Sequence, residues 1–169
     1  MNARHSAKSV EWYTPPAYVE AAREVMGSID LDPASCAEAN KGVGATLYFD
    51  EADDGLTLDW GGNVFLNPPG GKNANGSLVN QFWIRFVDEI GNGHCTQGVW
   101  IGYSLEQLQT IQRVSSISPI MGDAICIPNR RIAFIGKGGS PTHANYITYI
   151  GPHVETFAGV FGQFGQVRL

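Results

Sequence analysis

Apolar residues recur at every third or fourth position in three stretches of the chain, which predicts three amphipathic helices. The helices are expected over residues 15–26, 78–90 and 105–111. The residues that favour a start or a stop for them are Thr14, Gly27, Ser77, Gly91 and the capping box of Ser104 with Gln107. The prolines at positions 15 and 16 suit the first turn of the first helix.

Short apolar runs bounded by Pro, Asn or Gly predict buried strands between and after these helices. Four of the runs, which alternate with helices, cover 28–32, 45–49, 63–66 and 98–102. Four more follow closely at 124–127, 131–135, 145–150 and 158–161. Residues 34–44 are compatible with a short helix or a loop, and the Gly- and Asn-rich stretch 70–77 predicts a mobile loop.

This order of elements predicts an α/β fold. We expect an open, mostly parallel sheet with helices on both faces and an antiparallel carboxyl-terminal edge. A single domain should cover residues 11–169, preceded by a flexible polar segment over residues 1–10. Ligands of such sheets bind beyond the carboxyl ends of the strands, so the residues that follow the strands are the first candidates for a site.

Composition and charge exclude some classes of protein. The 169 residues are 43% hydrophobic and 16% charged, as in a protein with a packed core, which argues against wholesale disorder. A net charge of −5 excludes a strongly basic DNA-coating protein, but not a locally basic nucleic-acid binder. Residues 1–60 hold 4 Lys and Arg against 11 Asp and Glu, whereas residues 61–169 hold 7 against 5. The acidic part suits a cationic or hydroxyl-rich ligand and the other part suits phosphates, although chance clustering explains such small counts equally well.

The cysteines argue against a disulfide framework and against a zinc cluster. Cys36, Cys95 and Cys126 are odd in number, far apart and without a CxxC pair. His94 precedes Cys95 without metal-ligand spacing, so both are expected in a loop and no metal site is predicted. Without a signal-peptide pattern or a membrane-spanning apolar run, the expected location is the cytoplasm.

The tetrapeptide Asn67-Pro68-Pro69-Gly70 is the most specific motif in the chain. A buried strand delivers the Asn67 side chain, and two prolines stiffen the backbone that follows. The side-chain oxygen of Asn67 and the carbonyl oxygen of Pro68 then form two fixed acceptors, which suit an exocyclic amine. The structural alternative is a rigid loop start.

Three weaker motifs lie at comparable positions. They are Tyr13-Thr14-Pro15-Pro16 at a helix start, the stretch from Asp30 to Cys36 after the first strand, and Asp53-Asp54-Gly55-Leu56 before the third strand. A helix start offers backbone N–H groups to a carboxylate, and small residues after an acidic one let a ligand approach the backbone. Taken singly, an ordinary helix start and ordinary turns explain them as well.

The ordered set resembles DNA methyltransferases that methylate amines with S-adenosylmethionine. The chain is most similar to the small phage-type Dam family of DNA N6-adenine methyltransferases, over residues 11 to about 150. The stretches that carry the resemblance are Trp12-Tyr13-Thr14-Pro15, Asp30-Leu31-Asp32-Pro33-Ala34-Ser35, Asp54-Gly55-Leu56, Trp60, Asn67-Pro68-Pro69 and Arg130-Arg131-Ile132-Ala133-Phe134. The resemblance implies a Rossmann-like methyltransferase sheet, phage or prophage origin and a role in DNA modification.

The resemblance also implies roles for residues. The residues expected to bind S-adenosylmethionine are Tyr13, Thr14, Asp30, Asp32, Pro33, Ala34, Asp50 and Asp54, with Glu51 as the second choice for the ribose hydroxyls. Asn67, Pro68 and Pro69 would form the catalytic motif, in which Asn67 and Pro68 hold the N6 amine of an adenine flipped out of double-stranded DNA. The sulfonium of the cofactor is already an activated electrophile, so no metal and no covalent nucleophile is needed. No obligate protein partner is expected.

DNA contacts are expected from the 70–77 loop and from later basic and aromatic residues. The residues singled out are Gly70, Lys72, Tyr103, Arg130 and Arg131, with Arg113 and Lys137 as further cations. Gly70 stands where the broad class has an aromatic residue that stacks on the flipped base, so Tyr103, Trp83 or Tyr13 would have to replace it. Trp83 fits the core better, because it lies on the apolar stripe of its helix.

Two other hypotheses stay open at this stage. The same pair of acceptors suits another amine, such as cytosine N4 or a protein glutamine amide. A non-catalytic DNA- or protein-binding remnant of the fold is the second alternative. Plain nucleotide binding has little support, because the chain has no GxGxxG motif and no P-loop.

Overall fold

Seven strands form one mixed sheet in the computed structural model, which describes residues 12–136 and 143–169. Across the sheet the strand order is β2-β1-β3-β6-β8-β7-β9. The first four are parallel to one another, whereas β8, β7 and β9 join as antiparallel neighbours. The expected parallel sheet with an antiparallel carboxyl-terminal edge is therefore confirmed.

The strands of this sheet are β1 (Leu31–Asp32), β2 (Leu47–Tyr48), β3 (Gly62–Leu66), β6 (Cys95–Gly102), β7 (Ala124–Pro128), β8 (Tyr146–Ile150) and β9 (Gly165–Arg168). The helices are α1 (Pro16–Met26), α2 (Ala37–Val43), α3 (Leu78–Gly91), α4 (Glu106–Ile111) and α5 (Val154–Phe161), with a 3₁₀ turn, η1, at Pro119–Met121. The three expected helices are present, and the ambiguous stretch 34–44 contains α2.

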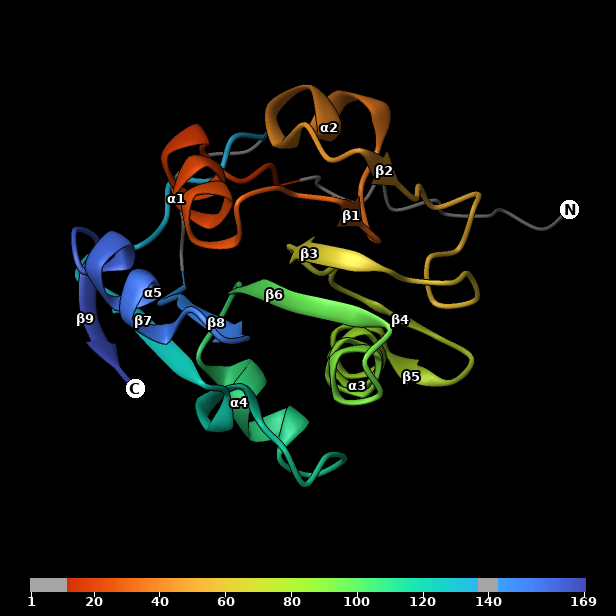
Figure 1. Ribbon diagram of the computed structural model, residues 1–169. Coiled ribbons are helices and arrows are strands. Elements are labelled where there is room, and N and C mark those ends of the chain that lie inside the picture. Colours follow the sequence, from red (N-terminus) through yellow and green to blue (C-terminus); the bar gives the residue numbers. More distant parts are fainter. Residues whose placement is uncertain (1–11, 137–142) are drawn as a thin grey trace, which may run out of the picture.

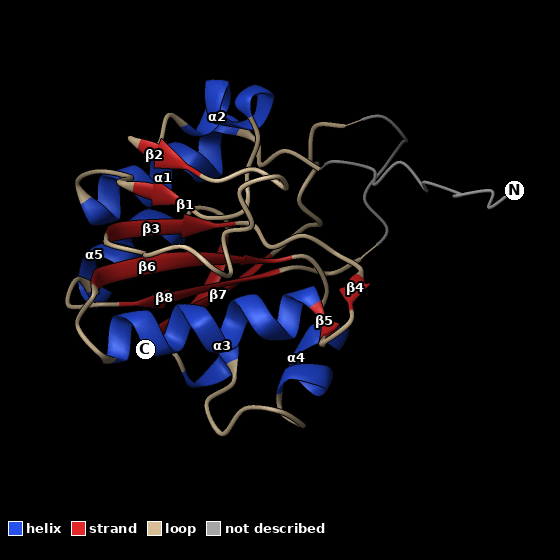
Figure 2. Cartoon of the chain, turned by 90° about the vertical axis from the view of Figure 1, so that its right-hand side faces the viewer, coloured by secondary structure: helices blue, strands red, loops and turns tan. Residues whose placement is uncertain are grey.

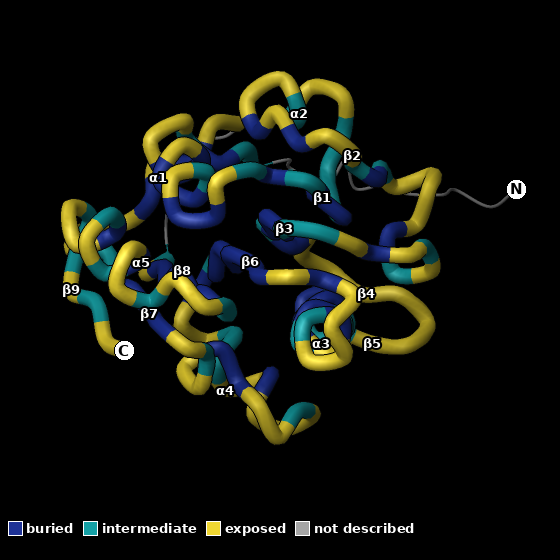
Figure 3. Tube along the Cα trace, viewed as in Figure 1, coloured by how far each residue is buried: buried dark blue, intermediate teal, exposed yellow. Residues whose placement is uncertain are grey.

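Helices cover both faces of the sheet (Figure 1). Strand β6 shows the division, because its side chains alternate between two cores. Val99 and Ile101 pack with α1 and α5, whereas Trp100 packs with α3 on the opposite face. Trp83 of α3 belongs to the second core and has no exposed surface, so the core assignment is confirmed. Burial is deepest in the middle of the sheet, where nearly all of β6 is buried, whereas the edge strands β2 and β9 are intermediate or exposed (Figure 3).

The chain reverses direction across the sheet at β1, which creates a topological switch point. From β1 it passes through α2 to β2 on one side, and then returns to β3 on the other side. Neighbouring strand ends that feed connections to opposite sides leave a crevice between them, where open α/β sheets bind ligands. Asp32 and Asn67 stand at these two ends. Figure 2 shows β1 and β3 ending at the edge where the β4–β5 ribbon also lies.

Three expectations about secondary structure are wrong. Residues 158–161 lie in α5 rather than in a strand, because Phe157 and Phe161 are one helical turn apart and stack on each other in the core. Residues 131–135 form only an isolated bridge, between Ile135 and Tyr13. The expected mobile loop at 70–77 contains a two-stranded ribbon, β4 (Lys72–Asn73) and β5 (Gly76–Ser77), which is exposed along nearly its whole length.

The helix ends differ from expectation at two of the predicted caps. Thr14 does not cap α1, because Pro15 occupies that position and no side chain accepts a capping hydrogen bond there. Ser104 and Gln107 bond to the backbone one residue away from the expected pattern, since Ser104 Oγ accepts from Glu106 N at 3.1 Å and Gln107 Oε1 accepts from Tyr103 N at 3.2 Å. Gly27, at φ 84°, ends α1 as expected, and Ser77 caps α3.

The expected start of one strand and the expected loop position of Cys95 are also wrong. Strand β6 begins earlier than expected, so Cys95 lies in a buried strand position rather than in a loop. None of the three cysteines, all of which lie within the described residues, forms a disulfide bond. Within the described residues no helix is both long and apolar enough to cross a membrane.

Candidate functional site

The segment that precedes α1 connects the sequence motifs to one another at the carboxyl edge of the sheet. Trp12 accepts a hydrogen bond from Asn67 at 2.8 Å through its backbone carbonyl. The hydroxyl of Tyr13 lies 3.8 Å from Cys36 Sγ, and the backbone of Tyr13 exchanges two 2.8 Å hydrogen bonds with Ile135. Four stretches that are far apart in the sequence therefore meet at one place.

Asn67 follows β3 and is held by only one end of its amide. Its Nδ2 donates to Trp12, while Oδ1 accepts no hydrogen bond from the described part of the chain. Side chains alternate along β3, so Asn67 lies on the face covered by α1, like Phe65 before it. Pro68 is buried, whereas Pro69 and Gly70 are exposed. The arrangement fixes the amide and leaves its oxygen as a free acceptor.

Asp32 is a buried carboxyl group at the end of β1. It is 3% exposed, and Oδ1 accepts one hydrogen bond, from Ala34 N at 3.3 Å. Burial raises the pKa of Asp32 to about 7, although the Ala34 amide opposes the rise. The nearby Ser35 hydroxyl also lowers this pKa, and its buried oxygen has no hydrogen-bonding partner within residues 12–136 and 143–169. No cation within the described residues pairs with Asp32, and a cationic ligand group would stabilise its ionised form.

The raised pKa predicts how Asp32 affects stability. Between pH 4 and pH 7 the folded state keeps the proton that the unfolded state has lost, so the free energy of unfolding falls as pH rises through this window. Between pH 4 and pH 8 we expect the free energy of unfolding of the wild type to fall by on the order of 4 kcal/mol relative to that of Asp32→Asn. Urea unfolding of both proteins at several pH values measures this difference, and parallel pH dependences would contradict the assignment.

Acidic groups lie across a shallow cleft from the loop that follows Asp32. The cleft has a volume of about 410 Å³ and is lined by Ser35, Cys36, Asp50, Glu51 and Ala52. Asp50 Oδ1 accepts from the backbone N–H groups of Ala52 and Asp53, at 2.8 and 3.0 Å, so one of its oxygens is already used to shape the turn. Glu51 is exposed beside it. The remaining carboxylate oxygens can accept hydrogen bonds from a ligand that carries hydroxyl groups.

The turn that contains Asp54 is packed against the Asp32 loop. A Cβ atom on Gly55 would lie 1.9 Å from the carbonyl oxygen of Pro33, so only glycine permits this contact. Asp54 has a φ of 56°, in a region that aspartate tolerates better than most residues. The two acidic motifs, 22 positions apart, are therefore neighbours in space.

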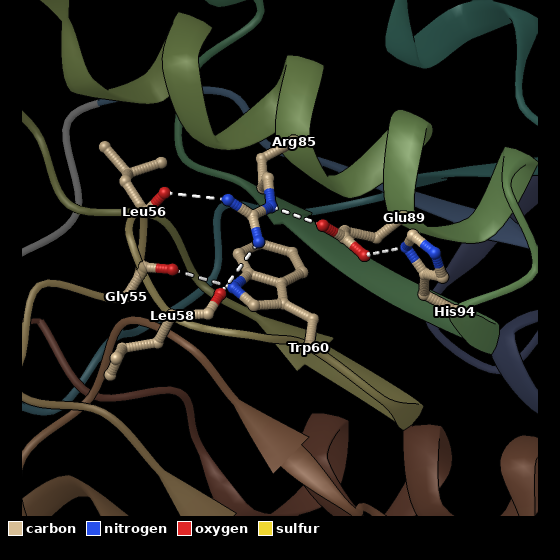
Figure 4. Close-up of polar contacts among 7 residues, drawn as sticks. All are labelled: Gly55, Leu56, Leu58, Trp60, Arg85, Glu89 and His94. Atoms are coloured by element: carbon tan, nitrogen blue, oxygen red, sulfur yellow. Dashed lines mark hydrogen bonds and ion pairs between the residues drawn. The ribbon is translucent and has the colours of Figure 1, made fainter.

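A polar network formed by Trp60 and by Arg85 of α3 holds the same turn (Figure 4). Trp60 Nε1 donates to the carbonyl of Gly55 at 2.7 Å, and the Arg85 guanidinium donates to the carbonyls of Leu56 and Leu58 at 2.8 Å each. Arg85 also forms a 2.6 Å ion pair with the largely buried Glu89. The turn that presents Asp54 is thus fixed by the scaffold in addition to its own hydrogen bonds, in which Leu56 N donates to Asp54 Oδ1 and Thr57 donates to the Asp54 carbonyl.

This network predicts that Arg85 stabilises the fold. In Arg85→Met two carbonyls lose a charged donor and Glu89 keeps only His94 as a partner, so we expect the free energy of unfolding to fall by about 2 kcal/mol. Urea denaturation measures the change. Lys72→Met is the matched control, because Lys72 lies on the exposed ribbon and should leave the midpoint unchanged. Equal stability of the two variants would contradict the role given to Arg85.

Asp30 is not part of the group at the carboxyl edge. Its carboxylate accepts from Ser28 Oγ and from Asn63 N, both at 2.8 Å, at the opposite ends of β1 and β3. Gln97 continues this network, donating to Asn63 Oδ1 and accepting from the Tyr149 hydroxyl. A structural role accounts for Asp30 fully.

The predicted DNA-contacting residues fall into two groups. Lys72 and Gly70 lie at or beside the exposed ribbon that follows Asn67. Tyr103 and Arg131 lie beyond the end of β6, while Arg130 is an exposed residue of the preceding turn. Lys137 lies outside the described residues, as does the expected flexible segment 1–10. Tyr13 is half-buried near Cys36 and Tyr103 is half-buried near Phe134, so both remain candidates to stack on a base, whereas the fully buried Trp83 does not.

Sequence analysis did not identify two residues that support the site. Asn145, 3% exposed, donates to the carbonyls of Gly102 and Tyr103 and accepts from Ile132 N at 2.8 Å, so it joins the end of β6 to the Arg131 segment. Arg85 supports the Asp54 turn in the same way. The only signal for Asn145 was a polar residue opening an apolar run, and the only one for Arg85 was a cation between Trp83 and Phe86 on an apolar helix.

No group of His, Cys, Asp and Glu within residues 12–136 and 143–169 could hold a metal ion.

Comparisons with known protein families, curated proteins and solved structures give no match to this chain.

Proposed function

We propose that this protein is an S-adenosylmethionine-dependent methyltransferase that acts on an exocyclic amine, and specifically on N6 of adenine in DNA. The observation that carries the proposal is that Asn67 and Asp32 stand at the ends of neighbouring strands. They project from neighbouring parallel strands, at the switch point of the sheet and on the face covered by α1. One presents a fixed neutral acceptor and the other a buried carboxylate without a cation.

The residues around the site fit the cofactor. Asp32 offers a carboxylate to an ammonium group, and the free oxygens of Asp50 and Glu51 suit ribose hydroxyls. The orphaned Ser35 hydroxyl lines the same cleft and lacks a partner that a ligand would supply. Asp54, fixed by Gly55 and Arg85, is the acceptor for the amine of an adenine ring. S-adenosylmethionine, when bound, supplies a methyl group that is already activated for transfer.

The chain's own contribution is to position the acceptor amine. An aromatic amine is a weak nucleophile, because its lone pair is delocalised into the ring. Asn67 Oδ1 and the Pro68 carbonyl accept its two N–H groups, which withdraws the lone pair from the ring and orients it. Asn67 cannot rotate freely, since Trp12 holds its Nδ2 at 2.8 Å. Such preorganised acceptors lower the barrier without the cost of reorienting at the moment of reaction.

The proposal is tested by methyl transfer from labelled S-adenosylmethionine to unmethylated double-stranded DNA, followed by digestion to nucleosides. Label in N6-methyladenine supports it. Label in N4-methylcytosine, or in a protein glutamine offered as the acceptor, contradicts the adenine assignment but keeps the reaction class. Absence of both transfer and cofactor binding in calorimetry contradicts the enzyme and leaves a binding remnant of the fold.

A further inference from the structure

The connection between α4 and β7 carries an exposed apolar surface. Its residues 114–122, called the apolar segment below, include no charged residue. Four large apolar residues of this segment are between 40% and 62% exposed, namely Val114, Ile117, Ile120 and Met121. The segment lies at the bottom of the molecule beside α4 in Figure 1 and in Figure 2. Single exposed apolar residues are ordinary on a protein surface, but a group of four so close together marks a contact with another molecule.

The backbone of the apolar segment is anchored to the core. The indole of the fully buried Trp83 donates to the carbonyl of Ile117 at 2.6 Å, and the buried hydroxyl of Thr148 donates to the carbonyl of Pro119 at 2.9 Å. Pro119 is itself buried. A Cβ atom on Gly122 would lie 2.4 Å from the Thr148 side chain, so the segment also packs closely on β8. A fixed backbone therefore presents the exposed apolar side chains.

Opposite charges stand at the two ends of the apolar segment. Helix α4 follows β6 at the carboxyl edge of the sheet, whereas β7 begins at the amino edge, because β6 and β7 both pair antiparallel with β8. The connection therefore crosses one face of the sheet from edge to edge. The exposed Arg113 precedes the apolar segment, and the exposed Asp123 follows it. Asp123 Oδ2 accepts from Gly151 N at 2.7 Å, which holds this carboxylate at the amino edge.

We propose that the apolar segment is the interface of a homodimer, in which it meets the same segment of a second copy in antiparallel orientation. A two-fold axis brings a surface against its own copy, so the surface must be complementary to itself. Parallel apposition would place like charges together at both ends of the segment. Antiparallel apposition places Arg113 of each copy opposite Asp123 of the other. The uncharged centre also limits repulsion between two copies that each carry a net charge of −5.

The dimer leaves the proposed methyl-transfer site open. The apolar segment is anchored to the core that contains Trp83, on the face of the sheet covered by α3. Asn67 lies on the opposite face, which α1 covers. The inference therefore does not depend on the proposed function, and its test measures self-association rather than methyl transfer.

Sedimentation equilibrium of the full chain over a wide range of concentrations tests the inference. We expect a dimer of about 37 kDa, twice the 18.3 kDa of one chain. Ile120→Glu and Met121→Glu each place two charges in the interface, one from each copy, and should raise the dimer dissociation constant by about 10-fold or more. Both residues are exposed, so neither change should disturb folding, and urea unfolding at a concentration where all proteins are monomeric checks this.

An exchange of charges tests the antiparallel orientation. Arg113→Glu and Asp123→Lys each bring like charges together, so each should raise the dissociation constant by about 3-fold or more. The double variant should return toward the wild-type value. Asp123→Lys also loses the hydrogen bond from Gly151, but Arg113→Glu cannot restore that bond, so recovery in the double variant reports the contact between copies. A double variant that dimerises no better than either single variant would contradict the antiparallel orientation.

Leu47→Glu is the matched control, because Leu47 is a comparably exposed apolar residue of β2, at the opposite end of the sheet. It should leave the dissociation constant unchanged. The inference is overturned if the chain is a monomer at every concentration, if Ile120→Glu and Met121→Glu dimerise as strongly as the wild type, or if Leu47→Glu weakens the dimer equally. A monomer that binds lipid vesicles through the apolar segment would also overturn it, because the occupant of the surface would not be a second copy.

Discussion

Asn67→Ala is expected to lower kcat for methyl transfer by about 100- to 1000-fold, as the loss of one preorganised hydrogen-bonding group does in other enzymes. The variant lacks Oδ1, the acceptor that orients the amine, and the loss is felt most in the transition state. Cofactor affinity should be unchanged, because the acidic cleft and Asp32 are untouched. Initial rates with saturating DNA measure the first effect, and calorimetry with S-adenosylmethionine measures the second.

Asn92→Ala is the matched control for this prediction. Asn92 is an exposed asparagine just after α3, remote in the sequence from the strand ends that form the site. It should retain wild-type kcat and wild-type unfolding. If Asn67→Ala keeps full activity, Asn67 does not hold the acceptor amine and the site must be sought elsewhere on the chain. If it loses cofactor binding as well, Asn67 has a structural role instead.

Gly55→Ala is expected to have the largest effect on the fold near the site. The added Cβ would overlap the Pro33 carbonyl oxygen at 1.9 Å and Pro33 C at 3.0 Å, and backbone atoms cannot turn aside as a flexible side chain does. The Asp54 turn must therefore separate from the Asp32 loop, at a cost of about 3 kcal/mol. Affinity for S-adenosylmethionine should fall together with stability, because both acidic motifs move.

Gly42→Ala controls for the addition of a methyl group. Gly42 lies within α2 with open space at its Cβ position, so this change should leave stability equal or raise it by up to about 1 kcal/mol. Urea unfolding and calorimetric titration of the two variants give the comparison. Wild-type stability and affinity in Gly55→Ala would show that the contact between the two loops contributes little.

The periodicity of apolar residues was a sufficient guide for the parallel half of the sheet. Strand β3 and helices α1 and α3 carry strong patterns, and they form where those patterns predict. The carboxyl-terminal third was harder, because short apolar runs suit a strand and a buried helix equally well. For this reason residues 158–161 were predicted as a strand although they lie in α5. Strand β9 was not predicted at all.

The candidate site shows the same division. The Asn-Pro-Pro motif could be singled out because two prolines after a strand constrain the backbone through covalent geometry alone. Asp30 and Asp32 could not be separated in this way, although they are two residues apart. One is consumed by hydrogen bonds at the amino ends of the strands, and the other is buried at the carboxyl end with a raised pKa.

The sequence by itself determined the α/β fold class, the apolar faces of α1 and α3 and the identity of the polar residues that follow the parallel strands. These features depend on local sterics and on a periodicity that is visible within a dozen residues. Only the tertiary structure decided that Trp12 holds Asn67, that Gly55 packs on Pro33, and that Asn145 joins Arg131 to the end of β6. Such contacts link positions tens of residues apart, and they form only because burial of two separate cores brings the strand ends together.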